Sequence, residues 1–123
     1  MVAYQTYPTQ SGNVQVYSLV DEIRQILVSC AGDYPDLEMI AGAFGMSSRS
    51  MRRHLAECDT SYQKLLNETR RELAMRSLRN GELSIEQIAE NLGFSDVTNF
   101  RHAFKKWVGT SPKKTKHLWR IMR

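Results

Sequence analysis

Apolar residues recur along this chain at the three- and four-residue spacing of amphipathic helices, from Leu19 to Ile121. No strand pattern or hairpin signal competes with this spacing, so the sequence predicts an all-α fold. Residues 1–17 show no period and are expected to form an arm or an interdomain linker, and residues 18–123 are expected to form one domain. The pattern predicts seven helices, at about residues 19–28, 37–44, 47–57, 61–79, 85–92, 96–107 and 112–121.

Residues that favour helix starts separate these segments. Asp36 and Ser47 precede two of the apolar runs, and their side chains can accept hydrogen bonds from the free N–H groups of a first helical turn. Ser84 precedes another run, and Gln87 three residues later completes a capping box. These positions predict where the second, third and fifth helices begin.

Two segments of the chain repeat each other. A shift of 48 residues places residues 37–47 onto residues 85–95, with Glu, Ile, Ala, Gly and Ser matching. In each copy a two-turn helix carries an inward Ala, and a Gly then reverses the chain before a second capped helix. This is the layout of a helix-turn-helix unit. The repeat predicts two such units, at about residues 37–57 and 85–107, joined by a linker helix at about residues 61–79.

The small residues of the repeat have specific roles. Ala41 and Ala89 must be small because the second helix of each unit crosses close above them. Gly45 and Gly93 are expected to adopt the left-handed backbone that reverses the chain sharply. In the second copy the inward apolar residue falls one position later, at Phe100, so its turn is expected to be slightly longer.

The charge is unevenly distributed. Residues 1–46 carry one Arg and five acidic residues, a balance of −4, whereas residues 47–123 carry sixteen Lys or Arg and eight acidic residues, a balance of +8. Such asymmetry favours contact between the second part and a polyanion, although an ordinary solvated basic surface has the same composition.

The residue groupings of an enzyme or a metal site are not found in the sequence. The three histidines fall on different predicted helices, and no Cys-x-x-Cys or Gly-rich phosphate loop occurs. No stretch reaches the roughly 18 apolar residues of a membrane span. Cys30 and Cys58 fit reduced residues of a cytosolic protein. We therefore expect no catalytic or metal-binding residues, no cofactor and no membrane contact.

Over about residues 20–119 these motifs resemble the AraC/XylS family of bacterial transcription regulators. The most specific match is the second unit, Ser84-Ile85-x-x-Ile88-Ala89-x-x-Leu92-Gly93-Phe94-Ser95-Asp96 and then Phe100-x-x-Ala103-Phe104-Lys105-Lys106-Trp107-x-Gly109-x-Ser111-Pro112. The resemblance implies seven helices, two of which enter successive major grooves on one face of a DNA duplex.

The chain departs from the family pattern at two places. The family usually has Gly where Asp59 stands, so the first recognition helix is expected to end in a less relaxed turn. Early in the last helix the family usually has an aromatic residue and an Arg, where this chain has Thr115 and Lys116. Leu118 and Trp119 are the expected substitutes that anchor this helix.

The outward faces of the two recognition helices supply the predicted base contacts. With Met51 and Leu55 inward, the first helix presents Ser48, Arg49, Arg52 and Arg53. The corresponding face of the second helix presents Val97, Thr98, Arg101 and His102. Arginine pairs bidentately with guanine in the major groove, and valine methyls suit the thymine methyl. For Arg101 and His102 phosphate contact is the alternative, and His102 can also be a merely solvated histidine.

A further group of residues is predicted to contact phosphates, which positions a protein on DNA without reading sequence. The group comprises Ser47, Ser95, Lys105, Lys106, Ser111 and Lys113. The start of the last helix has free N–H groups that suit an anion. The remaining cations of the tail either add to this field or belong to a solvated terminus; they are Lys114, Lys116, Arg120 and Arg123.

The predicted partner is double-stranded DNA. Because one chain carries both readers, the domain is expected to bind as a monomer, and RNA polymerase is an expected further partner if the regulator is an activator. The alternative is a helical protein-interaction module of the transcription machinery, which would expose apolar residues on its second helices. Residues 1–17 are too short for a sensing or dimerising domain, so the chain is either the isolated DNA-binding part of a regulator or a stand-alone member of the family. Their polar, aperiodic sequence favours the first reading, in which they are part of an interdomain linker.

Overall fold

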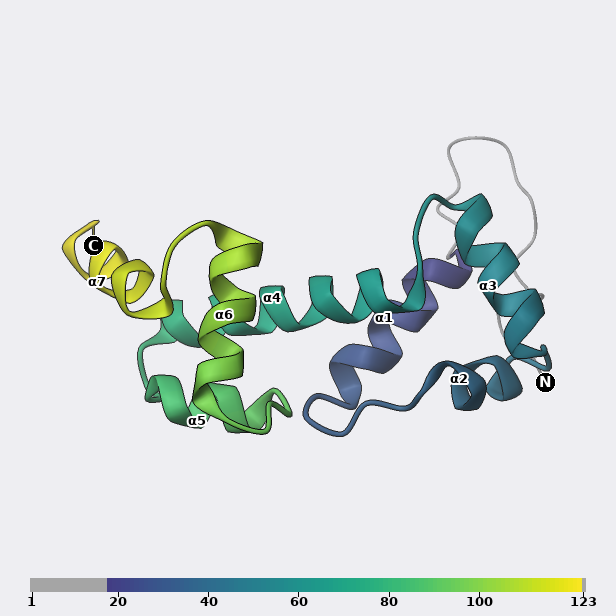
Figure 1. The fold of residues 1–123 in the computed structure, drawn as a ribbon, viewed down its shortest axis with the longest axis horizontal. Helices are drawn as coiled ribbons and strands as arrows, with labels where there is room; N and C mark the ends of the chain where they lie inside the picture. Colours follow the sequence, from purple (N-terminus) through teal and green to yellow (C-terminus); the bar gives the residue numbers. More distant parts are fainter. Residues whose placement is uncertain (1–17, 123) are drawn as a thin grey trace. The chain divides into compact units, whose positions relative to one another are not determined.

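The computed structural model describes residues 18–122, which form seven α-helices and no strand (Figure 1). This confirms the predicted all-α fold. The predicted arm at residues 1–17 lies outside the described residues, as does Arg123 of the basic tail. The helices are α1 (Leu19–Ser29), α2 (Leu37–Ala43), α3 (Ser48–Glu57), α4 (Tyr62–Asn80), α5 (Ile85–Asn91), α6 (Val97–Val108) and α7 (Pro112–Met122).

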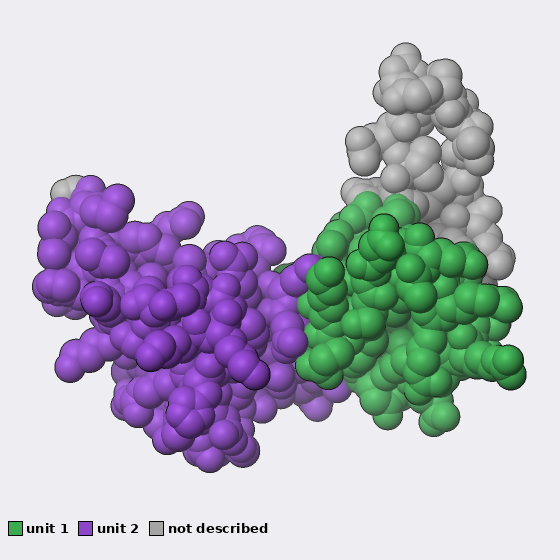
Figure 2. Space-filling model, turned by 45° about the horizontal axis from the view of Figure 1, so that its top comes forward, with its two compact units in different colours: residues 1–30, 35–66 green, residues 31–34, 67–123 purple. Residues whose placement is uncertain are grey.

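The chain divides into two compact units, which Figure 2 colours separately. The described part of unit 1 holds residues 18–30 and 35–66, which include α1, α2, α3 and the first residues of α4. Unit 2 holds residues 31–34 and the described residues from 67 onward, which include the rest of α4 and α5 to α7. The loop at residues 31–34 therefore belongs to unit 2, although it connects two helices of unit 1.

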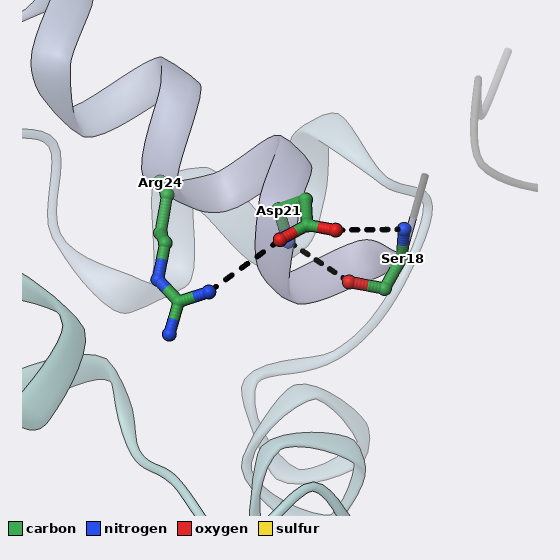
Figure 3. Close-up of polar contacts among 3 residues, drawn as sticks. All are labelled: Ser18, Asp21 and Arg24. Carbon is green, nitrogen blue, oxygen red and sulfur yellow. Dashed lines mark hydrogen bonds and ion pairs between the residues drawn. The ribbon is translucent and has the colours of Figure 1, made fainter. Parts of the chain in front are cut away.

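The start of α1 is closed by a capping box (Figure 3). The Asp21 N–H donates to the Ser18 hydroxyl at 3.1 Å, and the Ser18 N–H donates to the Asp21 carboxylate at 3.4 Å. Arg24 also forms an ion pair with Asp21, at 3.4 Å. Each half of such a box satisfies an N–H group that has no partner within the helix.

Unit 1 is held together by apolar side chains from all four of its helices. The side chains that are at most 2% exposed are Ile23, Leu27, Ile40, Ala41, Met51, Leu55 and Leu65. In addition, the Tyr62 hydroxyl donates to the carbonyl of Pro35, which ties the start of α4 to the segment before α2. The inward residues predicted for α2 and α3 are therefore confirmed.

Unit 2 has a core rich in aromatic residues. Its buried members are Ala74, Leu78, Ile88, Ala89, Leu92, Phe100 and Phe104. The rings of Phe100 and Phe104 have centroids 5.8 Å apart, and the half-buried Phe94 meets Phe100 edge-on at 5.4 Å. Pairs in this geometry stabilise a core by about 0.5–1.5 kcal/mol beyond the area that they bury. The apolar face of α6 packs against this core.

The last helix is anchored differently from the prediction in one respect. Trp119 packs against the core of unit 2, and the guanidinium of Arg79 lies 5.2 Å from the centroid of its ring. Leu118, by contrast, is 45% exposed, so it is not an anchor. The buried residues on this helix are Pro112 and Thr115. Thr115 can be buried because its hydroxyl donates to the Ser111 carbonyl at 2.9 Å. This bond satisfies a polar group at the position where the family usually has an aromatic residue.

Candidate nucleic-acid interface

The two helix pairs of the repeat are joined by turns with the same hydrogen bonds. In the first turn the Met46 N–H donates to the Ala41 carbonyl at 2.8 Å, and in the second the Phe94 N–H donates to the Ala89 carbonyl at 3.0 Å. The glycine before each donor has a positive φ, 71° in the first turn and 84° in the second. Both turns are therefore Schellman motifs, in which glycine takes a left-handed backbone without steric cost.

The two inward alanines are nearly inaccessible. Ala41 is 1% exposed and Ala89 is 2% exposed, as expected if each second helix crosses close above. The second helix of each pair begins at a cap, Ser47 for α3 and Asp96 for α6. The second cap comes one residue later than a shift of 48 predicts, which confirms the longer second turn.

Helix α3 separates apolar and basic residues by face. Met51 and Leu55 are buried, whereas Arg49, Arg52 and Arg53 are exposed. Within residues 18–122 none of these three guanidinium groups has a hydrogen bond or an ion pair, so their donors remain free for a ligand. Ser48, which is also a predicted base reader, is only partly exposed.

Helix α6 presents a different face. Phe100 and Phe104 are buried, and Thr98 and His102 are exposed. Val97 is only partly exposed, because its side chain packs against the core of unit 2. Less of its methyl surface is therefore available to a base than the sequence suggested.

Arg101 is also exposed on α6, but it already has a partner. Its guanidinium lies 3.6 Å from the carboxylate of Glu86 in the first turn of α5. The structure thus distinguishes Arg101 from the three arginines of α3, a difference that the sequence spacing did not reveal.

All six residues predicted to contact phosphates have polar atoms at or near the protein surface. Ser47, Ser95, Lys105, Lys106 and Lys113 are exposed, and Ser111 is partly exposed. Ser47 accepts a hydrogen bond from the Ser50 N–H at 3.1 Å, and Ser111 accepts one from the Lys114 N–H at 3.1 Å. The hydroxyl protons of both serines are therefore available to a phosphate oxygen.

Large apolar side chains do not gather on the two recognition helices. In the described part of the chain the exposed ones are Val28, Met39, Leu118, Ile121 and Met122, on α1, α2 and α7. The protein-interaction alternative requires such residues on α3 and α6, where the exposed residues are mainly basic or polar. The surface therefore favours an anionic partner.

Residues 18–122 contain neither a cluster of metal-binding side chains nor a membrane-spanning helix. No group of three or more His, Cys, Asp or Glu side chains is placed to hold a metal ion there. None of the helices in this range has the length and hydropathy that crossing a bilayer requires.

Comparison with known proteins identifies relatives over most of the domain. A family model described as a helix-turn-helix domain matches residues 40–117. The ornithine utilization regulator of Pseudomonas aeruginosa is 44% identical over 94 residues, which are 76% of this chain and 28% of that protein. The chain spans less than a third of the length of this relative and of the other first curated relatives.

Solved structures share the fold. A transcriptional regulator from Chromobacterium violaceum, described as AraC-type, has a TM-score of 0.76 and 22% identity, with 81% of this chain and 90% of that chain covered. The DNA-binding domain of AdpA, solved in complex with a target DNA, has a TM-score of 0.75 and 23% identity, with 85% and 95% covered.

Proposed function

Since this chain belongs to the AraC-type family of helix-turn-helix proteins, we propose that it is the DNA-binding part of a transcription regulator and recognises specific duplex sequences. The observation that carries the proposal is the repeated unit. Helices α3 and α6 each follow a glycine turn of the same kind. Each helix buries two large apolar residues and exposes polar or basic residues on its outer face. One relative is named as a regulator of ornithine utilization and another as a helix-turn-helix-type transcriptional regulator, and both names support the proposal. The proposed activity is binding rather than catalysis.

We propose that α3 enters a major groove and that its three free arginines read guanines, with Ser48 at the edge of the contact. On α6, Thr98 and His102 are the proposed base contacts, and the exposed part of Val97 faces a thymine methyl. Phosphate contacts position both helices, and the proposed residues are Ser47, Ser95, Lys105, Lys106, Ser111 and Lys113.

One chain carries both readers, so we propose that a single copy occupies two successive major grooves, which lie about 34 Å apart along B-DNA. The outward residues of α3 and α6 differ, and the two half-elements of the target should therefore differ as well. RNA polymerase is a proposed further partner only where the whole protein activates transcription.

The test begins with selection of a target from random duplexes, followed by footprinting and a gel-shift measurement of stoichiometry over a range of salt concentrations. We expect protection of about two helical turns, with two unlike half-elements and one chain per site. Lys64→Ala serves as the control for charge, because Lys64 is an exposed cation of unit 1 outside α3.

Two results would contradict the proposal. The first is the absence of any sequence preference at moderate salt. The second is a palindromic site that holds two copies, combined with affinity that does not change in the Thr98→Ala/His102→Ala double variant. That second result would mean that each chain uses a single reader and dimerises to reach the next groove.

A further inference from the structure

A basic hollow lies beside the second recognition helix. It has a volume of about 460 Å³ and is lined by residues of α5, α6 and α7 and by the cap of α5: Ser84, Ile85, Glu86, Arg101, Lys113, Lys116, His117 and Arg120. All of these residues belong to unit 2. The sequence placed three of them in a basic tail and one on a recognition helix, and gave no reason to group them.

The charges in this hollow do not balance. Four cations face one carboxylate, so the net charge is +3 with His117 neutral. The Lys116 ammonium donates to the Leu83 carbonyl at 3.3 Å, which holds one cation against the wall. Glu86 is the only acidic side chain in the lining, and it pairs with Arg101 at 3.6 Å. The surplus of positive charge fits an anion.

The position of Arg101 indicates which anion. Arg101 lies on α6, directly before His102 and three residues after Thr98, and both neighbours are proposed base contacts. A duplex that is engaged by α6 carries one phosphate at every nucleotide along the rim of the groove. An anion bound in the hollow would therefore be a phosphate of the same duplex that α6 reads.

We propose that this hollow binds a backbone phosphate of the DNA. In the free protein Glu86 is the ion-pair partner of Arg101, and on binding the phosphate takes the place of the Glu86 carboxylate. This inference rests on the proposed function and assigns Arg101 to phosphate contact rather than base reading. The exchange is easy because the two side chains are 48% and 66% exposed, and an exposed ion pair contributes little stability. Glu86 thus lowers the affinity for every duplex without affecting the choice of sequence.

The test compares four variants of the whole chain, Glu86→Gln, Arg101→Gln, the double variant, and Lys114→Gln. Lys114 is an exposed cation of α7 that does not line the hollow, so it controls for the loss of one charge. Each protein is titrated with a random duplex of about 20 base pairs and with the selected target, over a range of salt concentrations.

We expect Glu86→Gln to tighten binding to both duplexes equally, by about three- to fivefold, because it frees Arg101. Arg101→Gln should weaken binding to the random duplex and to the target equally. It should also reduce the slope of log affinity against log salt concentration by about one. The gain from Glu86→Gln should vanish in the Arg101→Gln background. Lys114→Gln should change affinity by less than about twofold.

Three results would overturn the inference. Arg101→Gln could change the preferred base while binding to the random duplex stays constant, which would make Arg101 a base reader. Glu86→Gln could leave affinity unchanged, or its gain could persist without Arg101. Failure of the proposed function looks different, because the parent chain would then show no preference for any target.

Discussion

The guanidinium carbon of Arg70 lies 4.7 Å from the centroid of the Phe94 ring. The same guanidinium lies 5.1 Å from the centroid of the Tyr34 ring, so one arginine of α4 contacts two aromatic residues of unit 2. Phe94 follows the glycine turn between α5 and α6, and its ring also packs against Phe100. Through Phe94, Arg70 therefore stabilises the turn from which the second recognition helix starts.

We expect Arg70→Ala to lower the free energy of unfolding of unit 2 by about 1–3 kcal/mol, because both cation–π contacts are lost. Arg71→Ala is the matched control, since Arg71 is the next residue and is exposed. It should change stability by less than about 0.5 kcal/mol. Denaturant unfolding followed by tryptophan fluorescence reports on unit 2, because Trp107 and Trp119 both lie there. Equal stability of the two variants would show that the stacking contributes nothing.

The glycine of the second turn has a close neighbour. A Cβ atom added at Gly93 would lie 2.9 Å from the carbonyl oxygen of Gly32, and φ there is +84°. At Gly109 φ is +96°, but no atom lies within 4 Å of an added Cβ. Gly109→Ala should therefore cost only the left-handed strain of about 1–2 kcal/mol.

Gly93→Ala should cost clearly more than Gly109→Ala, about 3 kcal/mol or more, because the clash with backbone adds to the same strain. Thermal unfolding followed by tryptophan fluorescence measures both losses. Similar losses for the two variants would mean that the loop at residues 31–34 does not approach the turn.

Substitution of the inward alanine tests the close helix crossing. Ala89→Leu should destabilise unit 2 by about 1–3 kcal/mol, because a nearly inaccessible site must take three more carbon atoms. Ala56→Leu on the exposed face of α3 provides the control and should be almost neutral. A thermal melt of Ala89→Leu that matches the parent would show that the crossing has room.

The end of α3 stores strain that one substitution can remove. Asp59 has a φ of 58°, and the following N–H, of Thr60, donates to the Leu55 carbonyl at 2.9 Å. The less relaxed turn predicted from the sequence is therefore confirmed. Asp59→Gly should stabilise the protein by about 0.5–1 kcal/mol, because glycine adopts this backbone freely.

The contrasting variant for that turn is Ala56→Gly, three residues earlier, exposed and within the last turn of α3. It should destabilise the protein by about 0.5–1 kcal/mol, because glycine is less favourable than alanine in a helix. Circular dichroism melts of both variants measure the difference. A loss of stability in Asp59→Gly would indicate that the aspartate side chain itself supports the turn.

The last prediction concerns sequence recognition by α3. Arg53→Ala should weaken binding to the selected target by about 1–3 kcal/mol and relax the preference at one base pair, because a bidentate contact to guanine is lost. Lys64→Ala should leave the base preference unchanged. Competition between the target and its single-base variants measures both effects. An equal loss on the target and on random DNA would make Arg53 a phosphate contact instead.

The sequence by itself determined the helices and their starts. A cap such as Ser47 or Ser84 acts within one helical turn, and the inward positions of α3 and α6 follow from a period of 3.6 residues. The glycine turns and the strained turn at Asp59 also depend only on residues that are close together in the sequence. For the same reason the arginines on the outward face of α3 could be named in advance.

Only the tertiary structure decided which residues meet across helices. Glu86 and Arg101 form a pair, and Arg70 reaches Tyr34 as well as Phe94, although these residues are far apart in the chain. No periodicity encodes such contacts, because they depend on how α4, α5 and α6 pack. Packing also decided that Leu118 is exposed while Thr115 is buried. The spacing of apolar residues in α7 allows more than one face of the helix to point toward the core, and only the packed structure shows which face does.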